Sequence, residues 1–190
     1  MDTQLLLIRH GKTQGNLERR YIGDREEPLC EAGAREALLQ RAVMPAIDCL
    51  YTGPARRCRE TAEILFPGVP AKLCGLAEID FGVFKGKNAD DLLGDPAYEQ
   101  WLSTSCMGDI PGGDSVTEFK ARTCETFRRL AEESKPGLTA LVIHGGNIMA
   151  VMERFSLPRR DFYDYHIPNC GAILCRYQDG RITVIERSGA

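Results

Sequence analysis

Hydrophobic and polar positions follow two different periods along this chain. Short, continuous apolar runs bounded by Gly, Pro or Asp indicate buried strands. Apolar or small residues that recur every three or four positions indicate amphipathic helices instead. The pattern predicts strands at 3–8, 46–53, 71–76 and 138–144. It predicts longer helices at 30–43, 56–65, 114–134 and 147–155.

The order of these elements predicts the fold class. Strands alternate with helices, and "AILCRYQDGRITVIE" (172–186) indicates a hairpin that turns at "QDG". We therefore expect an α/β fold, a three-layer α/β/α sandwich around a mostly parallel central sheet with a C-terminal hairpin. The absence of an internal repeat or a linker predicts one domain over 1–190.

Two segments fall outside this alternation. The stretch 77–114 is punctuated by Gly, Asp and Pro, and it predicts only short helices near 89–93 and 96–104. The stretch 19–27 is polar and contains the acidic run "DREE". We expect both segments to form cap or rim loops.

Composition and charge narrow the functional classes. The 190 residues are 43% hydrophobic and 27% charged, with a formal net charge of −3. A mildly acidic chain is atypical of a general nucleic-acid binder. The apolar run after Asp2 is too short for a signal peptide, and no run approaches the roughly 18 residues of a membrane span. We expect a cytoplasmic protein that binds no nucleic acid and no membrane; the sequence leaves a homodimer open.

The cysteines and histidines argue against a metal centre. The eight cysteines are scattered without a C-x-x-C pair, and the three histidines lack metal-ligand spacing. We expect reduced thiols that serve as small hydrophobic residues, no metal and no cofactor.

Basic side chains follow the ends of three predicted strands. Arg9 and His10 end the first strand, Arg57 opens the helix after the second, and His144 ends the strand at 138–144. In open α/β sheets, ligands bind at the carboxyl edge, where helix N-termini favour anions. The sequence therefore predicts a pocket for a small phosphorylated substrate.

Several motifs resemble those of the histidine phosphatase superfamily, whose fold is phosphoglycerate mutase-like. "RHGKTQGN" (9–16) is similar to the R-H-G-x-T-x-x-N signature, and further similar segments follow in the family's order. These segments are "PLCEAG", "YTGPARRCRETAEIL", "AEIDFGVFKG", "PGGDS" and "VIHGGNIM". The tail "FYDYHIPNCGAILC" is similar to that of the shorter bacterial phosphatases, the α-ribazole phosphatase-like branch.

The resemblance implies roles for the clustered residues. It makes His10 the nucleophile, which must be neutral to attack phosphorus, and nearby cations favour that form. The planar forks of Arg9 and Arg57 match phosphate oxygens, and His144 would complete the clamp as a donor. Secondary substrate contacts are expected from Thr13, Asn16 and the backbone N–H of Gly145.

A proton donor for the leaving group is also implied. The family's E-x-x-F-G motif places Glu78 in this role, and a carboxyl beside phosphate has a raised pKa. Asp80, two residues further on, is the alternative. The family's usual serine is replaced by Gly53, which puts one hydroxyl contact near the phosphate in question.

Two competing sites are less favoured. "CGAILCR" (170–176) has the C-x5-R spacing of cysteine-dependent phosphatases, but its apolar interior indicates a buried strand rather than a phosphate loop. His166 lies between Tyr165 and Ile167 and is expected to be a rim residue.

We therefore expect a phosphomonoesterase that acts through a phosphohistidine on a small phosphorylated metabolite, with α-ribazole 5′-phosphate as the specific candidate. The alternatives are a phosphoglycerate mutase-type phosphotransferase and a non-catalytic phosphate-binding relative. The short insertion at 77–114 and the chain end after the hairpin leave little to exclude water from a phosphoenzyme, so we expect hydrolysis.

Overall fold

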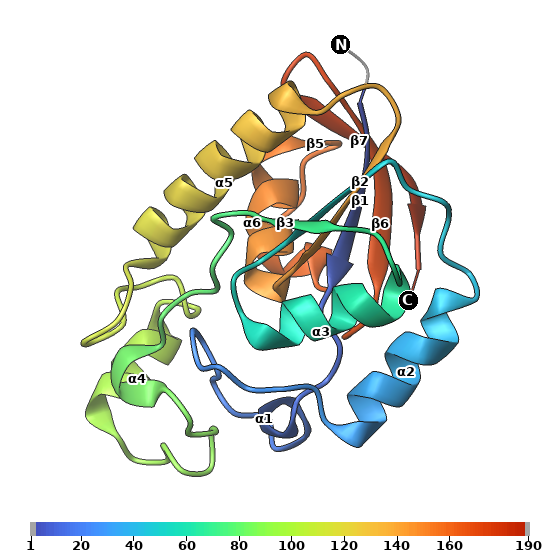
Figure 1. The fold of residues 1–190 in the computed structure, drawn as a ribbon. Coiled ribbons are helices and arrows are strands. Elements are labelled where there is room, and N and C mark those ends of the chain that lie inside the picture. Colours follow the sequence, from blue (N-terminus) through green and yellow to red (C-terminus); the bar gives the residue numbers. More distant parts are fainter. Residues whose placement is uncertain (1–2, 189–190) are drawn as a thin grey trace.

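The computed structural model describes residues 3–188, which form a central sheet flanked by helices (Figure 1). The strands are β1 (Thr3–Arg9), β2 (Cys49–Thr52), β3 (Ala71–Leu73), β4 (Leu138–Ile143), β5 (Ser156–Leu157), β6 (Ala172–Gln178) and β7 (Arg181–Arg187). The α-helices are α1 (Gln14–Leu17), α2 (Glu31–Arg41), α3 (Arg56–Leu65), α4 (Pro96–Ser103), α5 (Val116–Glu133) and α6 (Gly145–Phe155). Short 3₁₀ helices are η1 (Gly82–Phe84) and η2 (Phe162–Tyr165).

The sheet is mostly parallel and carries an antiparallel hairpin, as predicted. Its strand order is β3-β2-β4-β1-β6-β7-β5. Strands β1 to β4 pair in parallel, whereas β6 is antiparallel to both β1 and β7. The β6–β7 hairpin turns at Asp179 and Gly180, which have φ values of 50° and 72°. Positive φ at both central residues fits the tight turns that follow the right-handed twist of a hairpin.

Strand β1 explains why an uninterrupted apolar run is needed at the centre of the sheet. Leu5 and Leu7 point to one face, which α5 and α6 cover, and Leu6 and Ile8 point to the other, which α2 and α3 cover. All four leucine and isoleucine side chains are buried. Since successive side chains point to opposite faces, burial on both sides requires every position to be apolar.

The segment 77–114 folds around a small hydrophobic cluster of its own. Phe84, Leu92, Tyr98 and Trp101 are buried there, and Phe119 of α5 closes the cluster on the side of the sheet. In Figure 1, α4 lies beside the carboxyl ends of the parallel strands. The cluster therefore attaches this segment next to the edge where the predicted site lies.

Some predicted elements are shorter or absent. The helix predicted at 89–93 is a series of turns, in which the N–H groups of Leu92 and Leu93 donate to the carbonyls three residues earlier. Gly94, with a φ of 79°, ends the segment before a helix can extend. The strand predicted at 71–76 keeps only the three residues of β3, at the edge of the sheet.

Candidate active site

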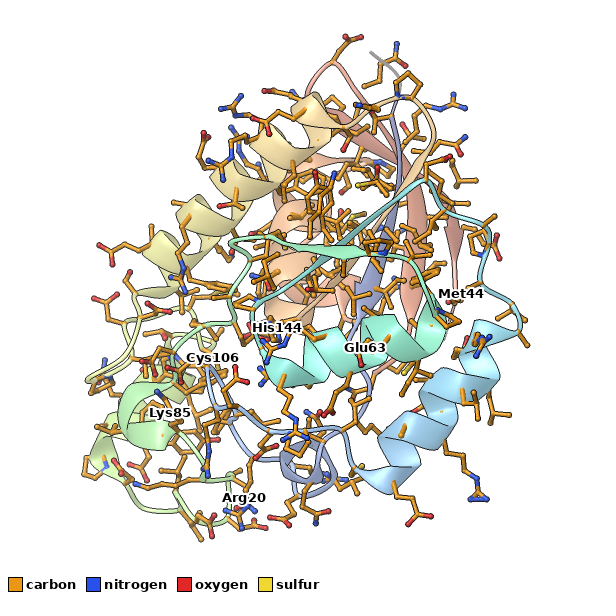
Figure 2. The ribbon with its side chains drawn as sticks, in the orientation of Figure 1. Arg20, Met44, Glu63, Lys85, Cys106 and His144 are labelled. Atoms are coloured by element: carbon orange, nitrogen blue, oxygen red, sulfur yellow. The ribbon has the colours of Figure 1, made fainter. Side chains whose placement is uncertain are left out.

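A cavity of about 380 Å³ opens at the carboxyl ends of the parallel strands. The register of the sheet explains how two distant histidines meet beside it: Arg9 of β1 pairs with Ile143 of β4, so the next residues, His10 and His144, leave the sheet together. Their ring centroids are 5.2 Å apart in an edge-on arrangement. Figure 2 shows His144 at the end of α6 that faces this edge.

His10 is held in one tautomer and one position. Its Nδ1 lies 2.7 Å from the carbonyl oxygen of Gly11 and its Nε2 lies 3.2 Å from Nε of Arg57. An arginine only donates, so Nε2 is the unprotonated nitrogen and Nδ1–H donates to Gly11. Burial, together with the charge of Arg57, lowers the pKa of His10 well below its ordinary value. The neutral ring therefore carries its lone pair on Nε2, where it accepts from Arg57, and an unprotonated Nε2 is what a nucleophile needs.

Arg57 is anchored by the rim segment 19–27. It is 1% exposed, its Nη1 donates to the carbonyl of Arg25 at 2.7 Å, and its Nη2 donates to the carbonyl of Gly23 at 2.6 Å. Nη2 also lies 3.1 Å from Nδ1 of His144. The two terminal guanidinium nitrogens of Arg57, which the family resemblance assigned to phosphate, are thus engaged with backbone carbonyls. Arg57 places its charge beside both histidines, and its Nε donates a hydrogen bond to Nε2 of His10.

Arg9 keeps a donor available for an anion. Its Nη1 donates to the carbonyl of Ile167 at 2.8 Å and lies 3.1 Å from Nε2 of His166. Its Nε is buried without a hydrogen-bond partner among the described residues. A buried N–H without a partner is costly, so this nitrogen is suited to donate to an anion.

His144 is fully buried behind Arg57 and does not line the cavity. Because Arg57 donates to Nδ1, the neutral ring carries its proton on Nε2, which lies 3.6 Å from Sγ of Cys58. Burial, followed by the charge of Arg57, lowers the pKa of His144 well below its ordinary value. At Gly53, a Cβ would lie 3.4 Å from the same Nε2. A serine at position 53 would bring its hydroxyl towards Nε2 of His144. Because this chain has Gly53 instead, the thiol of Cys58 is the polar side chain beside that nitrogen.

Asn16 lines the cavity and Thr13 lies behind it. The Oδ1 of Asn16 accepts from the Thr13 N–H at 3.1 Å and from Nδ2 of Asn169 at 3.3 Å, which leaves the amide nitrogen of Asn16 to donate. Thr13 is fully buried and its hydroxyl caps the short helix α1. The structure thus places Thr13 as a support for Asn16 and away from the cavity.

The N-terminus of α6 forms one wall of the cavity. His144 is its N-cap, and Gly145 and Gly146 both line the cavity with backbone N–H groups that lack partners within the helix. A Cβ at Gly146 would lie 2.5 Å from Oε1 of Glu78. Glycine therefore allows Glu78 to approach the helix terminus closely.

The pKa values of Glu78 and Asp80 are shifted in opposite directions. Burial raises the pKa of Glu78, against hydrogen bonds from Ile79 and Gly146 and the charges of Arg57 and Arg9, and its side chain lines the cavity. A hydrogen bond from Lys85 lowers the pKa of Asp80, whose Oδ1 lies 2.8 Å from Nζ of Lys85. Asp80 does not line the cavity. The geometry favours Glu78 over Asp80 as the group that holds a proton near the site.

The two competing sites lie at different depths. His166 is exposed at the rim, and burial lowers the pKa of its ring. Cys170 is 1% exposed, does not line the cavity, and burial raises its pKa to about 12. A thiol that stays protonated away from the cavity is unsuited to nucleophilic attack.

Sequence patterns did not indicate the aromatic wall of the cavity. Tyr21, Phe81, Trp101, Phe119 and Phe162 come from separate segments and line it together. Trp101, Phe119 and Phe162 lie on three different helices and the other two rings lie in loops, so no shared periodicity marks them as one wall. Only the density of aromatic residues in 77–114 and the tail was available as a signal.

The described residues 3–188 contain no cluster of His, Cys, Asp and Glu arranged to hold a metal ion. Their eight cysteines are free. No helix in the same range is long and apolar enough to cross a membrane.

Comparisons with known proteins identify a family and relatives of this chain. A model of the histidine phosphatase superfamily (branch 1) matches residues 5–188. "Probable phosphoglycerate mutase GpmB" from Photorhabdus laumondii is 31% identical over 192 residues, which cover 92% of this chain and 85% of that protein. The structure of a phosphoglycerate mutase from Thermus thermophilus has 30% identity and a TM-score of 0.74, covering 97% of this chain and 98% of that one. A putative alpha-ribazole-5′-P phosphatase from Escherichia coli has 21% identity and a TM-score of 0.89, covering 99% and 97%, which shows the shared fold.

Proposed function

We propose that this chain, which belongs to the histidine phosphatase superfamily, is a phosphomonoesterase that works through a phosphohistidine on His10. Members of this superfamily are phosphatases or phosphomutases, and the chain is accordingly an enzyme. The observation that carries the proposal is the state of His10: a buried, neutral imidazole whose Nε2 lone pair faces Arg57 at the cavity.

The first step forms the phosphoenzyme. Nε2 of His10 attacks phosphorus while the bond from phosphorus to the ester oxygen breaks, and Glu78 gives its proton to that oxygen. The Nδ1–H group keeps donating to the Gly11 carbonyl oxygen, and this hydrogen bond stabilises the positive charge that develops on the ring. The phosphoryl oxygens lie between the free Nε of Arg9 and the N-terminus of α6.

The second step returns the enzyme to its starting state. Glu78, now ionised, takes a proton from water, the water oxygen attacks phosphorus, and the bond from phosphorus to Nε2 breaks. Inorganic phosphate leaves and Glu78 is protonated again. Neither step uses a metal ion or a thiol.

The test of the nucleophile is His10→Ala. We expect this variant to lose turnover of p-nitrophenyl phosphate by at least about 10³-fold, because no other group can replace a covalent nucleophile. Wild-type protein quenched in base with ³²P-labelled substrate is expected to carry acid-labile phosphate, and EDTA is expected to leave the rate unchanged. Residual activity of more than a few per cent in correctly folded His10→Ala would refute the assignment.

A mutase is the second candidate, because curated relatives are named probable phosphoglycerate mutases. Hydrolysis and mutase action share the phosphohistidine and differ in whether water reaches it. We expect release of inorganic phosphate from phosphomonoesters and only traces of interconversion between 2- and 3-phosphoglycerate. A coupled assay run with 2,3-bisphosphoglycerate decides this: interconversion faster than phosphate release would establish the mutase while keeping His10 as the nucleophile.

The specific candidate substrate is α-ribazole 5′-phosphate. It is supported by the motifs of the chain and by the names of two solved structures with the same fold, at 21% and 20% identity. Direct comparison of its hydrolysis with that of other phosphomonoesters tests this choice.

A further inference from the structure

We infer that the cavity selects phosphomonoesters whose leaving group is aromatic and uncharged, and that it rejects leaving groups that carry a carboxylate. This inference rests on the proposed phosphomonoesterase function and adds the chemistry of the leaving group. It is carried by the wall of the cavity beyond the phosphate end, where Phe81 belongs to the E-x-x-F-G motif and Tyr21 and Trp101 belong to none of the motifs quoted above.

The wall beyond His10 and Arg9 is built from aromatic rings. The Tyr21 ring lies 5.0 Å from Phe81 and 5.6 Å from Trp101, measured between centroids. The ring of Phe162, on η2, lies 5.1 Å from that of Tyr163. All five residues line the cavity. Flat, polarisable surfaces of this kind bind aromatic groups by stacking and by excluding water.

The segments that carry these rings approach one another across the cavity. The Tyr163 hydroxyl donates to the carbonyl of Ser105, which follows α4, at 3.4 Å. The ring of Phe162 packs beneath Nζ of Lys120 of α5 at 4.2 Å. The space between them is therefore bounded on more than one side, as a stacked ring requires.

A carboxylate on the substrate would find no unpaired cation in this part of the cavity. Arg20 is the one cationic lining residue, within the described chain, that lies away from the phosphate end, and Figure 2 shows it far from His144. Its guanidinium bonds Glu18 at 2.5 Å and Asp91 at 2.6 Å, so its charge is already compensated. His166 at the rim has a lowered pKa and is neutral near pH 7.

The polar groups on the wall are neutral and few. Burial raises the pKa of Tyr21 above its usual value and that of Tyr163 to about 12, so both phenols keep their protons. Nε1 of Trp101 is buried without a hydrogen-bond partner among the described residues. None of these groups carries a charge that would pair with a carboxylate, and the ring surfaces around them favour an aromatic group.

The experiment compares three esters of primary alcohols, whose leaving groups differ little in acidity. These are 2-phenylethyl phosphate, glycerol 3-phosphate and 3-phosphoglycerate. Trp101 is the single tryptophan of the chain and lines the cavity, so its fluorescence reports binding without turnover. In His10→Ala, we expect 2-phenylethyl phosphate to bind at least about ten-fold more tightly than glycerol 3-phosphate, and 3-phosphoglycerate to bind most weakly. The kcat/KM of the wild type for phosphate release is expected to follow the same order.

A matched pair of variants assigns the preference to the wall. Phe81 lines the cavity, whereas Phe127 of α5 is fully buried against Phe155 and Tyr177 and does not line it. Phe81→Leu is expected to lower kcat/KM for 2-phenylethyl phosphate by about five-fold more than kcat/KM for glycerol 3-phosphate. Phe127→Leu is expected to leave the ratio between the two esters unchanged.

Each outcome separates this inference from the proposed function. Release of phosphate that depends on His10 but shows equal preference for the three esters would overturn the inference and keep the phosphomonoesterase. Binding of 3-phosphoglycerate as tight as that of 2-phenylethyl phosphate would also overturn it. Absence of turnover with the predicted order of binding would overturn the phosphomonoesterase and keep the selectivity of the cavity.

Discussion

At the scale of single residues, burial drives the base and the acid of this site towards their neutral forms. Removing a charged group from water is unfavourable, so desolvation lowers the pKa of His10 and raises that of Glu78. The result is a base without its proton and an acid that keeps its proton to a higher pH than an ordinary carboxyl, beside the same cavity. This is the pairing that a phosphoryl transfer to an imidazole requires before substrate binds.

Glu78→Gln tests the acid. We expect kcat/KM for an alkyl phosphate to fall by about 10²–10⁴-fold, because an alkoxide leaves poorly without a proton. The kcat/KM for p-nitrophenyl phosphate is expected to fall by less than about ten-fold, since nitrophenolate leaves without assistance and kcat/KM reports the first step, before Glu78 acts on water. Equal losses of kcat/KM on both substrates would show that Glu78 is structural.

The pH profile provides a second measurement on the same residue. The raised pKa of Glu78 means that the proton is lost only above the ordinary carboxyl range, so alkyl ester hydrolysis should decline as the pH rises through that value. The p-nitrophenyl phosphate profile of the wild type should lack this alkaline decline. Asp80→Asn is the matched control, because the pKa of Asp80 is lowered and its proton is absent at the working pH.

At the scale of elements, the candidate catalytic residues lie at strand ends and helix starts, and the short helix α4 carries part of the aromatic wall of the cavity. Helix α4 carries Trp101 and Tyr98, whose buried rings lie 6.1 Å apart between centroids. Its eight residues are too few to be stable alone, so it depends on packing and on its cap. Asp95 provides that cap by accepting from the N–H groups of Ala97 at 2.9 Å and Tyr98 at 3.3 Å.

Asp95→Ala is expected to destabilise α4 by about 1 kcal/mol, because two backbone donors lose their acceptor. The emission of Trp101 should shift to longer wavelength and become more accessible to acrylamide, while the global melting temperature falls by only a few degrees. Glu99→Ala, at an exposed position of the same helix, is the control. An unchanged Trp101 signal in Asp95→Ala would show that packing alone holds the helix.

At the scale of the whole molecule, the buried site makes stability depend on pH. His10 and His144 have folded-state pKa values well below the ordinary 6.5, so only the unfolded chain takes up their protons as the pH falls below 6.5. Their contribution is fully present above 6.5 and is lost towards acid. Glu78 acts oppositely, since its raised pKa lets the folded protein take a proton before the unfolded chain does as the pH falls.

We expect the free energy of unfolding to fall between pH 7.5 and 5, with about 2 kcal/mol of the loss due to His10 alone. Urea titrations at both pH values measure this loss. His10→Gln should reduce it by about that amount, because glutamine has no proton to gain. His166→Gln, at the exposed rim, should leave most of the loss in place. An equal acid loss in the wild type and His10→Gln would show that other groups dominate.

The sequence by itself determined the alternation of strands and helices and the residues that follow the strand ends. These features depend on local periodicity, and parallel pairing then brings Arg9, His10 and His144 to one edge whatever the loops do. Tertiary structure decided the rest. It shortened the strand predicted at 71–76, which lies at the edge of the sheet, and replaced the helix predicted at 89–93 with turns that end at Gly94.

Only the tertiary structure decided the ionisation states and the aromatic wall. The pKa of His10 depends on burial and on Arg57, which the carbonyls of Gly23 and Arg25 hold in place from a loop remote in sequence. The wall joins Tyr21, Trp101 and other rings from separate segments. Burial and contact between distant segments are properties of the packed chain, and no local pattern of residues encodes them.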